Sequence, residues 1–283
     1  MKIIRRRGGR SEMFVTGEPW DPAYAERFAD GTCDGLVVGV PTCLNSGPAT
    51  DLAFLPGVPG LRSLRVLKGL PDLSSVARCV ELVRLSLPAS ATRELDLTGL
   101  TALRALEAPW PAVARSLSAL DSLDELVATE WRGASLSALG PKPALRKLRL
   151  ETGRDHVTDA EGTSLLPSLV ELRLYGGRLA HPELLAGAVA LEEVSLLTAR
   201  TGSLAFVTGL PRLRRLELEN SGDIGSLAPV RDHPALREVI LSGSTTVADG
   251  DLSPLLGNPR LTYVALERGH AHYSHAPREV RKG

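Results

Sequence analysis

The sequence is poor in aromatic residues, in long apolar runs and in net charge, and each shortage excludes a class of protein. Phe, Trp and Tyr make up 4% of the 283 residues, so the basic residues lack the aromatic neighbours of a platform for single-stranded nucleic acid. No run approaches the roughly 20 apolar residues that a membrane-spanning helix needs. Basic and acidic residues number 33 each, so no overall field attracts nucleic acid or an anionic membrane.

Cysteine is also scarce. The three cysteines, Cys33, Cys43 and Cys79, are too few and odd in number for a disulfide framework. They indicate buried thiols in a reducing compartment, although Cys33 and Cys43 could pair in a secreted protein. The first ten residues are basic but have no apolar stretch behind them, so they do not form a secretory signal. The sequence therefore predicts a soluble, cytoplasmic protein, and an excess of arginine over lysine of 28 to 5 indicates a bacterial source.

What the sequence has is a repeat with the spacing L-x-x-L-x-L. Its copies begin at Leu61, Leu82, Leu103, Leu123, Leu145, Leu169, Leu191, Leu213, Leu236 and Leu261. All three inward positions of every copy are apolar, although only 43% of the chain is. A period of 20 to 25 residues is too short for an independent domain and is typical of one coil of a solenoid.

The run PRLRRLELENSGDIGSLAPV, from Pro211 to Val230, resembles the leucine-rich repeat superfamily, nearest its short bacterial, internalin-like class. The resemblance covers about Leu61 to Leu266. It implies an α/β leucine-rich-repeat solenoid, a right-handed horseshoe with a parallel β-sheet on the concave face. Within each coil the segment that carries the second apolar cluster, after the strand, is too short for a long helix. We therefore expect short helical or 3-10 turns on the convex face.

The sequence departs from the family at one position of the coil. Three residues after the last inward residue, the family usually has asparagine, whose side chain satisfies buried backbone groups at the turn. This chain has Gly69, Ser90, Pro111, Trp131, Gly153, Gly177, Ala199, Ser221, Ser244 and Gly269 there. Backbone groups or water are expected to take over that role.

Three regions follow from the extent of the repeat. We expect an N-terminal cap with a short helix at residues 1–34, about ten to eleven coils at 35–267, and a C-terminal cap or frayed tail at 268–283. In the first region Asp21 can cap a helix that Gly31 ends, which would lay Tyr24 and Phe28 over the first coil. The run GLVVGV at 35–40 resembles an incomplete first strand.

The side chains between the inward leucines should point to water from the concave face. Across ten strands they include six basic and nine acidic groups, a net charge of −3. One of the three columns alternates in sign and predicts exposed ion pairs of little energetic weight. The other two combine arginine, tyrosine and apolar residues, which are enriched at interfaces, although isolated exposed apolar residues are also normal. The candidate partner-binding residues are Arg149, Arg173, Tyr175, Leu197, Glu217, Glu219 and Ile240.

Other motifs are weak. Trp110 and Trp131 follow successive strands and either extend the contact surface along its rim or pack over the turns. His270 and His272 have a spacing that metals can use, but no carboxylate or cysteine set completes a site. Residues 249–251 (DGD) lack the further ligands of a calcium loop. No phosphate-binding, zinc-protease, serine-hydrolase or C-x-x-C motif occurs, so we expect no catalytic residue, metal or cofactor.

The sequence therefore predicts a non-enzymatic, monomeric scaffold that recognises a partner protein through the concave face. The acidic excess there favours a partner with a basic patch. Two alternatives stay open. The repeats could be the targeting or regulatory subunit of an enzyme complex, although no non-repeat segment exceeds about 60 residues. The basic N-terminus, Arg5 to Arg7, could bind nucleic acid, although a solvated arm accounts for it better.

Overall fold

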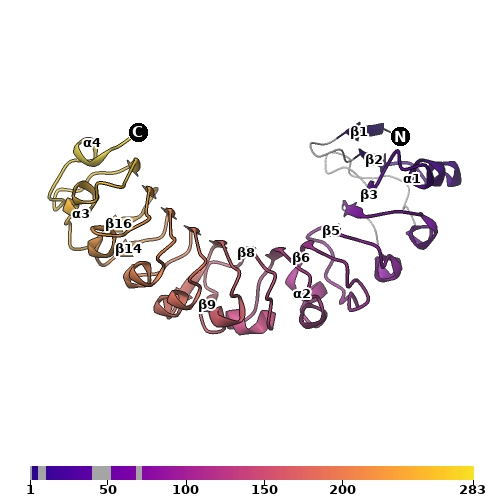
Figure 1. Ribbon diagram of the computed structural model, residues 1–283, viewed down its shortest axis with the longest axis horizontal. Helices are drawn as coiled ribbons and strands as arrows, with labels where there is room; N and C mark the ends of the chain where they lie inside the picture. Colours follow the sequence, from indigo (N-terminus) through magenta and orange to yellow (C-terminus); the bar gives the residue numbers. More distant parts are fainter. Residues whose placement is uncertain (1, 6–10, 40–51, 68–71) are drawn as a thin grey trace. The chain divides into compact units, whose positions relative to one another are not determined.

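A computed structural model describes residues 2–5, 11–39, 52–67 and 72–283, and these form two compact units, Met1–Glu130 (unit 1) and Trp131–Gly283 (unit 2). In both units each coil adds one short strand to a sheet, and the chain then returns on the other side of the coil (Figure 1). The strands of the coils form where the sequence places the inward leucines.

The described part of unit 1 contains seven strands in one sheet. They are β1 (Lys2–Arg5), β2 (Ser11–Thr16), β3 (Gly35–Gly39), β4 (Ser63–Val66), β5 (Arg84–Ser86), β6 (Ala105–Pro109) and β7 (Glu125–Thr129). Their order in the sheet is their order in the chain. Every neighbouring pair is parallel except β1 and β2, which pair antiparallel. Parallel neighbours require a crossover connection, and each coil supplies one.

Unit 2, which is described without a gap, continues the same pattern. Its main strands are β8 (Lys147–Glu151), β10 (Glu171–Tyr175), β12 (Glu193–Leu197), β13 (Arg215–Glu219), β15 (Glu238–Ser242) and β17 (Tyr263–Leu266). All neighbours are parallel and in register. Two small parallel sheets lie outside this sheet, β9 (Val157–Asp159) with β11 (Arg178–Ala180) and β14 (Asp223–Ile224) with β16 (Thr246–Val247).

Short helical turns return the chain, as the sequence predicts. Unit 1 has η1 (Pro22–Ala25), α1 (Glu26–Ala29), η2 (Leu55–Gly57), η3 (Ser74–Arg78), α2 (Trp110–Val113) and η4 (Leu117–Ala119) among its described residues. Unit 2 has η5 (Leu136–Leu139), η6 (Thr163–Leu165), η7 (Pro182–Gly187), η8 (Ala205–Gly209), η9 (Ala228–Val230), α3 (Ser253–Gly257) and α4 (Pro277–Val280). The η elements are 3-10 helices of three to six residues.

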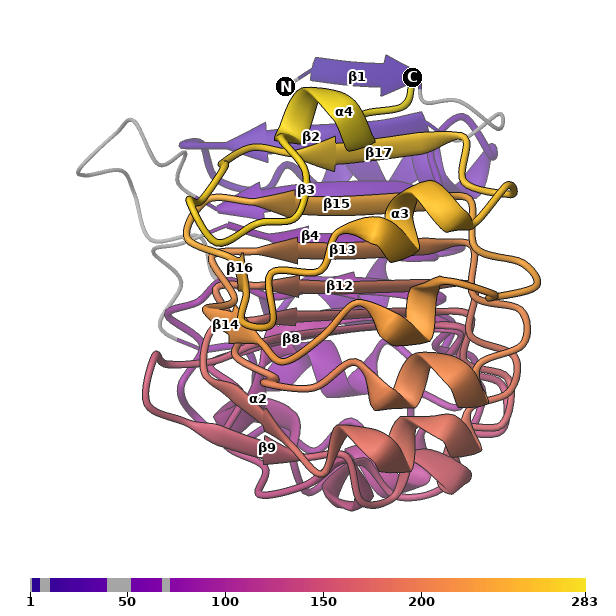
Figure 2. The ribbon, with the colours of Figure 1, turned by 90° about the vertical axis from the view of Figure 1, so that its left-hand side faces the viewer.

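The core is the leucine spine. Of the thirty inward repeat positions, all are buried except Leu266, at the end of the last strand. In Figure 2 the strands of unit 2 lie one above another, so each inward leucine is covered by the equivalent residues of the coils above and below. No single coil can bury its own apolar edge.

The N-terminal edge differs from the expectation. A short helix does form, and Phe28 is buried, while the Trp20 ring stacks on Phe54 with 4.1 Å between centroids. However, β3 is not the first strand, because β2 pairs beside it and buries Met13 and Val15 completely. Arg5 belongs to β1 rather than to a solvated arm, and Arg6 and Arg7 lie outside the described residues. Position 40, the last residue of the expected first strand, also lies outside them.

The C-terminal segment packs against the last coils of unit 2. Val280 of α4 is fully buried, and Lys282 forms an antiparallel bridge with Val264 of β17. The Tyr273 hydroxyl accepts a hydrogen bond from the Val247 amide at 3.0 Å, which ties the segment to β16. Figure 2 shows α4 lying against β17 at the end of the stack.

Serine and threonine hydroxyls replace the missing asparagine ladder in unit 2. The buried Ser221 hydroxyl donates to the Leu196 carbonyl at 2.9 Å, and the Thr245 hydroxyl accepts from the Ser221 amide and donates to the Leu218 carbonyl. The Thr152 hydroxyl donates to the Trp131 carbonyl at 3.0 Å. The turn is therefore satisfied by side chains from the position expected for asparagine and from the residue beside it.

A second set of buried polar residues lies three positions before the first leucine of a coil. Most coils have an apolar residue there, such as Leu210, but His233, Asn258 and Lys142 are buried polar exceptions. The His233 Nε2–H donates to the Leu210 carbonyl at 3.0 Å, because its Nδ1 accepts from the Leu236 amide. Asn258 has the same pattern, with Nδ2 donating to the Val230 carbonyl at 2.8 Å and Oδ1 accepting from a backbone amide.

Among the described residues, Cys33 and Cys79 are buried and free. Burial raises the pKa of the Cys79 thiol to about 11. Cys43, and with it the alternative pairing of Cys33, lies outside the part of the chain that the structure describes. Over the same described residues, we find no helix with the length and apolar content required to span a bilayer.

Replacing Ser221 with alanine is expected to lower the free energy of unfolding by about 1 kcal/mol, because a buried hydrogen bond to the Leu196 carbonyl is lost. Ser244 occupies the same position one coil later but is exposed. Ser244→Ala should therefore leave stability unchanged. Urea unfolding followed by circular dichroism measures both variants, and equal losses would contradict the role given to Ser221.

His233 should make stability depend on pH. Burial lowers the pKa of His233, and its backbone hydrogen bonds offset only part of this effect. The unfolded chain therefore takes up a proton more readily than the folded chain. The contribution of neutral His233 is complete above its unfolded pKa of about 6.5 and is lost as the pH falls toward the folded pKa.

The variant His233→Asn retains a donor and an acceptor, as Asn258 does at the equivalent position, but cannot titrate. Its urea midpoint should fall less than that of the natural chain between about pH 7.5 and about pH 5.5. An identical pH dependence in the two proteins would show that His233 does not contribute.

Candidate functional site

The outward side chains of unit 2 form three columns that run across its strands. Strand register places Lys147, Glu171, Glu193, Arg215, Glu238 and Tyr263 in the first column. The second column holds Arg149, Arg173, Ser195, Glu217, Ile240 and Ala265, and the third holds Glu151, Tyr175, Leu197, Glu219 and Ser242. These columns follow from the period of two along a strand and from the absence of register shifts.

All seven candidate partner-binding residues lie in the second and third columns, and we refer to them as the contact surface. Arg149, Arg173, Glu217 and Ile240 belong to the second column, and Tyr175, Leu197 and Glu219 belong to the third. The strand register places all seven on one face of unit 2. Their role in binding stays a prediction.

Arg149 and Tyr175 form the most exposed part of the contact surface. The Arg149 guanidinium carbon lies 5.4 Å from the centre of the Tyr175 ring, and its Nη2 lies 2.6 Å from Glu151 Oε1. Tyr175 as a whole residue is 40% exposed. The arrangement orients a planar cation and an aromatic ring together toward solvent, at a position where a partner could desolvate both.

Arg215 joins the first and second columns. Its Nη1 donates to Glu238 Oε2 at 2.6 Å, and its Nη2 donates to Glu217 Oε2 at 3.2 Å. The buried Ser195 hydroxyl donates to the same Glu217 oxygen at 3.1 Å. Burial lowers the pKa of Arg215, but the two carboxylates outweigh this effect and raise the pKa overall. Sequence reasoning missed this network, because it treated the first column as separate exposed pairs.

The Arg173 side chain is paired with a glutamate of the first column. Its Nε lies 2.5 Å from Glu171 Oε1, in an ion pair without the alignment of a hydrogen bond. Lys147 Nζ lies 4.0 Å from the other oxygen of the same carboxylate. The Arg173 side chain is nevertheless 43% exposed, so it remains accessible to a partner.

Trp131 does not extend the contact surface. Its side chain is 1% exposed, and Nε1 donates to the Thr158 hydroxyl at 3.0 Å. A Cβ atom at Gly133 would lie 2.3 Å from the indole ring, so the ring packs directly on the glycine. Of the two alternatives, packing over the turn is therefore correct for Trp131. Trp110 begins α2 in unit 1.

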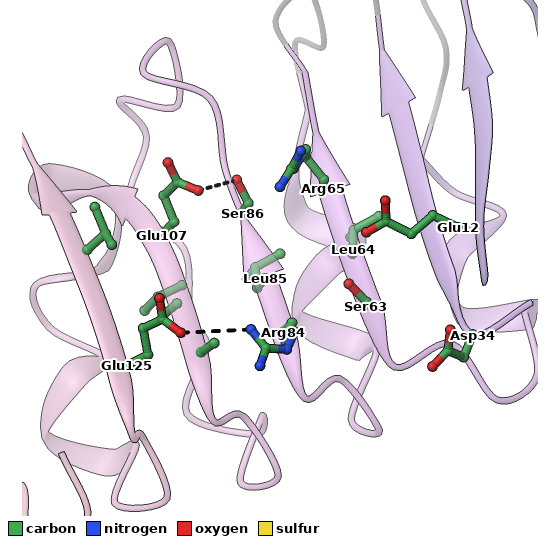
Figure 3. Close-up of a pocket in the computed structure, with 13 residues that line it drawn as sticks. Glu12, Asp34, Ser63, Leu64, Arg65, Arg84, Leu85, Ser86, Glu107 and Glu125 are labelled. Atoms are coloured by element: carbon green, nitrogen blue, oxygen red, sulfur yellow. Dashed lines mark hydrogen bonds and ion pairs between the residues drawn. The ribbon is translucent and has the colours of Figure 1, made fainter. Parts of the chain in front are cut away.

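Unit 1 has a hollow of about 400 Å³ on its own sheet face (Figure 3). Its side chains carry mixed charge. The Ser86 hydroxyl donates to Glu107 Oε2 at 2.9 Å, and Arg84 Nη1 lies 3.8 Å from Glu125 Oε2. Two more carboxylates, Glu12 and Asp34, and one more guanidinium, Arg65, line the hollow. Carboxylates outnumber guanidiniums, as they also do among the outward side chains of unit 2.

The remaining motifs do not form a site. The His270 and His272 rings are 5.7 Å apart, and His272 Nε2 lies 3.0 Å from the Val247 carbonyl oxygen. In the described residues, no group of three or more His, Cys, Asp or Glu side chains is placed to hold a metal ion. Asp249 and Asp251 accept hydrogen bonds from the backbone amides two residues later, as expected for residues at a turn.

Known proteins match this chain through structure. No family model and no curated protein matches the sequence. The structure of an internalin (inlF) from Listeria monocytogenes matches with a TM-score of 0.60 and 15% identity, covering 93% of this chain and 84% of the internalin.

Internalin C2 (inlC2) from the same organism matches with a TM-score of 0.54 and 21% identity over 65% of this chain and 80% of its own. A leucine-rich-repeat protein from Leptospira interrogans matches with a TM-score of 0.51 and 16% identity over 89% of this chain and 82% of its own. Identities this low show the fold alone. The predicted leucine-rich-repeat fold of the internalin kind is confirmed.

The network around Arg215 should contribute little to stability. Arg215→Gln is expected to lower the free energy of unfolding by at most about 1 kcal/mol, because solvent screens a side chain that is about a third exposed. Arg212→Gln changes an exposed arginine on the same coil and serves as the control. The difference between the two variants in urea unfolding should shrink at about 1 M salt. A larger, salt-independent loss would indicate a packing role for Arg215.

Proposed function

We propose that this leucine-rich-repeat chain is a non-enzymatic scaffold that binds a partner protein through the contact surface of unit 2. The leucine-rich-repeat fold is typically a protein-binding scaffold. The observation that carries the proposal is the exposed pair of Arg149 and Tyr175. On the neighbouring strands, Arg173 lies beside Arg149 in the second column and Leu197 lies beside Tyr175 in the third.

The chemistry of the contact surface supports this function. Tyrosine and arginine contribute most to binding energy when a partner removes them from water. Arg149 and Arg173 are already oriented by Glu151 and Glu171, so less side-chain entropy is lost when a partner binds. The leucine spine behind the sheet fixes the backbone, which places these groups on a rigid support.

The charge of the face supports a partner with a basic patch. Unit 2 turns four basic side chains outward from its strands, against seven acidic ones counted through Glu267. A basic partner would be attracted to this excess, and the rate of association should fall as salt is added. We propose that the scaffold acts as a monomer in the cytoplasm, which the two buried free thiols support.

The two alternatives make different predictions. A targeting or regulatory subunit would use the same contact surface but would copurify with an enzyme. Nucleic-acid binding through the N-terminus would shift DNA or RNA in a gel at low salt, and would be lost when residues 1–10 are deleted. The place of Arg5 in a paired strand does not favour this second alternative.

Site-specific photocrosslinking tests the proposed function. A photoreactive phenylalanine analogue replaces Tyr175 in the contact surface, and the control places the same analogue at Val189, an exposed residue after η7. In the native cell, position 175 should yield one or a few protein adducts that position 189 does not. The double variant Arg173→Glu with Leu197→Ala should remove the adducts, because it reverses one charge and deletes an apolar contact. The same adducts from both positions, or none from position 175, would contradict the proposed function.

A further inference from the structure

A second hollow in unit 2 lies beyond the carboxyl ends of its strands. It has a volume of about 500 Å³. Thr152, Gly176, Thr198 and Asn220, the residues that directly follow β8, β10, β12 and β13, are among those that line it. We call this hollow the trough. The third column of the sheet face, including Tyr175 and Leu197, ends directly at its border.

The trough exists because neighbouring coils approach each other too closely for side chains. Gly176 and Gly177 have φ angles of 80° and 73°, which side-chain-bearing residues rarely adopt. A Cβ atom at Gly176 would lie 2.4 Å from the Thr152 carbonyl oxygen, and one at Gly177 would lie 2.5 Å from the His156 carbonyl oxygen. The floor of the trough is therefore bare backbone, fixed by the stacking of the coils.

The side chains around this floor are positive. Arg154 and Arg200 are exposed, line the trough, and form no ion pair with any residue that the structure describes. No carboxylate lines the trough. Of the glutamates that end β8 and β13, Glu151 pairs with Arg149 at 2.6 Å, and Glu219 accepts a hydrogen bond from the Asn220 amide group at the border of the trough.

Few other donors are available. The Thr152 and Thr198 hydroxyls already donate to backbone carbonyls. The two guanidiniums, the Ser244 hydroxyl and the second N–H of the Asn220 amide group remain. Guanidinium groups hold carboxylates and phosphates by paired hydrogen bonds, which gives the trough the chemistry of an anion site.

We propose that the trough binds glutamate or aspartate side chains of an extended segment of the partner protein, held by Arg154 and Arg200. This inference rests on the proposed function, because the trough continues the contact surface at its third column. The face is acidic and the trough is basic, so the partner carries basic groups over the strands and acidic groups beyond their carboxyl ends. A segment that crosses the strands from one region to the other matches both charges.

The test uses the full chain and a fluorescein-labelled hexaglutamate peptide, with binding measured by anisotropy at low salt. Arg154→Glu with Arg200→Glu should reduce the affinity by about tenfold or more, because two attractive contacts become repulsive. The matched control is Arg146→Glu with Arg212→Glu, which changes the same net charge at two exposed arginines that precede their strands and do not line the trough. The control should reduce the affinity by less than about twofold.

Equal losses in the two double variants, or no peptide binding at all, would overturn the proposal. Inorganic phosphate at about 10 mM should displace only a small part of the hexaglutamate, because a single phosphate lacks the linked contacts of several carboxylates on one chain. Strong competition that depends on Arg154 and Arg200 would instead identify a simple oxyanion site and would also overturn the proposal.

The two proposals fail separately. If position 175 yields no adducts while hexaglutamate binding depends on Arg154 and Arg200, the proposed function is wrong and the trough is an anion site of another kind. If the adducts form and survive Arg154→Glu with Arg200→Glu while hexaglutamate does not bind, the scaffold stands and the trough has no part in recognition.

Discussion

The stacking of one coil's leucines on those of the next is the interaction on which this protein depends. A coil of about 22 residues cannot enclose a core, and only its neighbours remove Leu172, Leu196 and Leu218 from water. Parallel pairing without register shifts then fixes the side chains between these leucines in columns. The same stacking brings the backbones of neighbouring turns together and excludes side chains at Gly176 and Gly177. The contact surface and the trough are both consequences of it.

The spine could be predicted from the sequence because periodicity reports burial directly. The ends of the solenoid could not, because an end is defined by the loss of the pattern. The strand at Ser11–Thr16 has only two inward residues, Met13 and Val15, and gives a weak signal. At the asparagine position of its coil, Ser221 was expected to leave the buried backbone groups of the turn to other backbone groups or to water. Its side chain is buried instead, and its own hydroxyl donates to the Leu196 carbonyl.

The members of the candidate site could be predicted, but their mutual contacts could not. A period of two places Arg149, Arg173 and Glu217 on one face whatever their rotamers. Whether Arg215 reaches Glu217 or Glu238 depends on side-chain torsions and local burial, which a linear pattern does not contain. For Trp131 even the location could not be predicted, because a residue directly after a strand can lie either on the rim or in the core. The core position is possible because Gly133 has no side chain where the indole ring packs.

The charged residues of the sheet face and of the trough all lie at outward positions, because the inward positions must be apolar. The fold does not require a particular residue at an outward position, so the face can be acidic while the trough is basic. Lys147 and Arg215 on the face are neutralised by neighbouring glutamates, whereas Arg154 and Arg200 are not neutralised by any described residue. An arginine or lysine that is already paired with a glutamate can still contact a partner, but it gains less from a partner's carboxylate than an unpaired one does, since the two carboxylates compete for it. The unpaired arginines at the carboxyl ends of the strands are therefore where a partner's negative charge gains most.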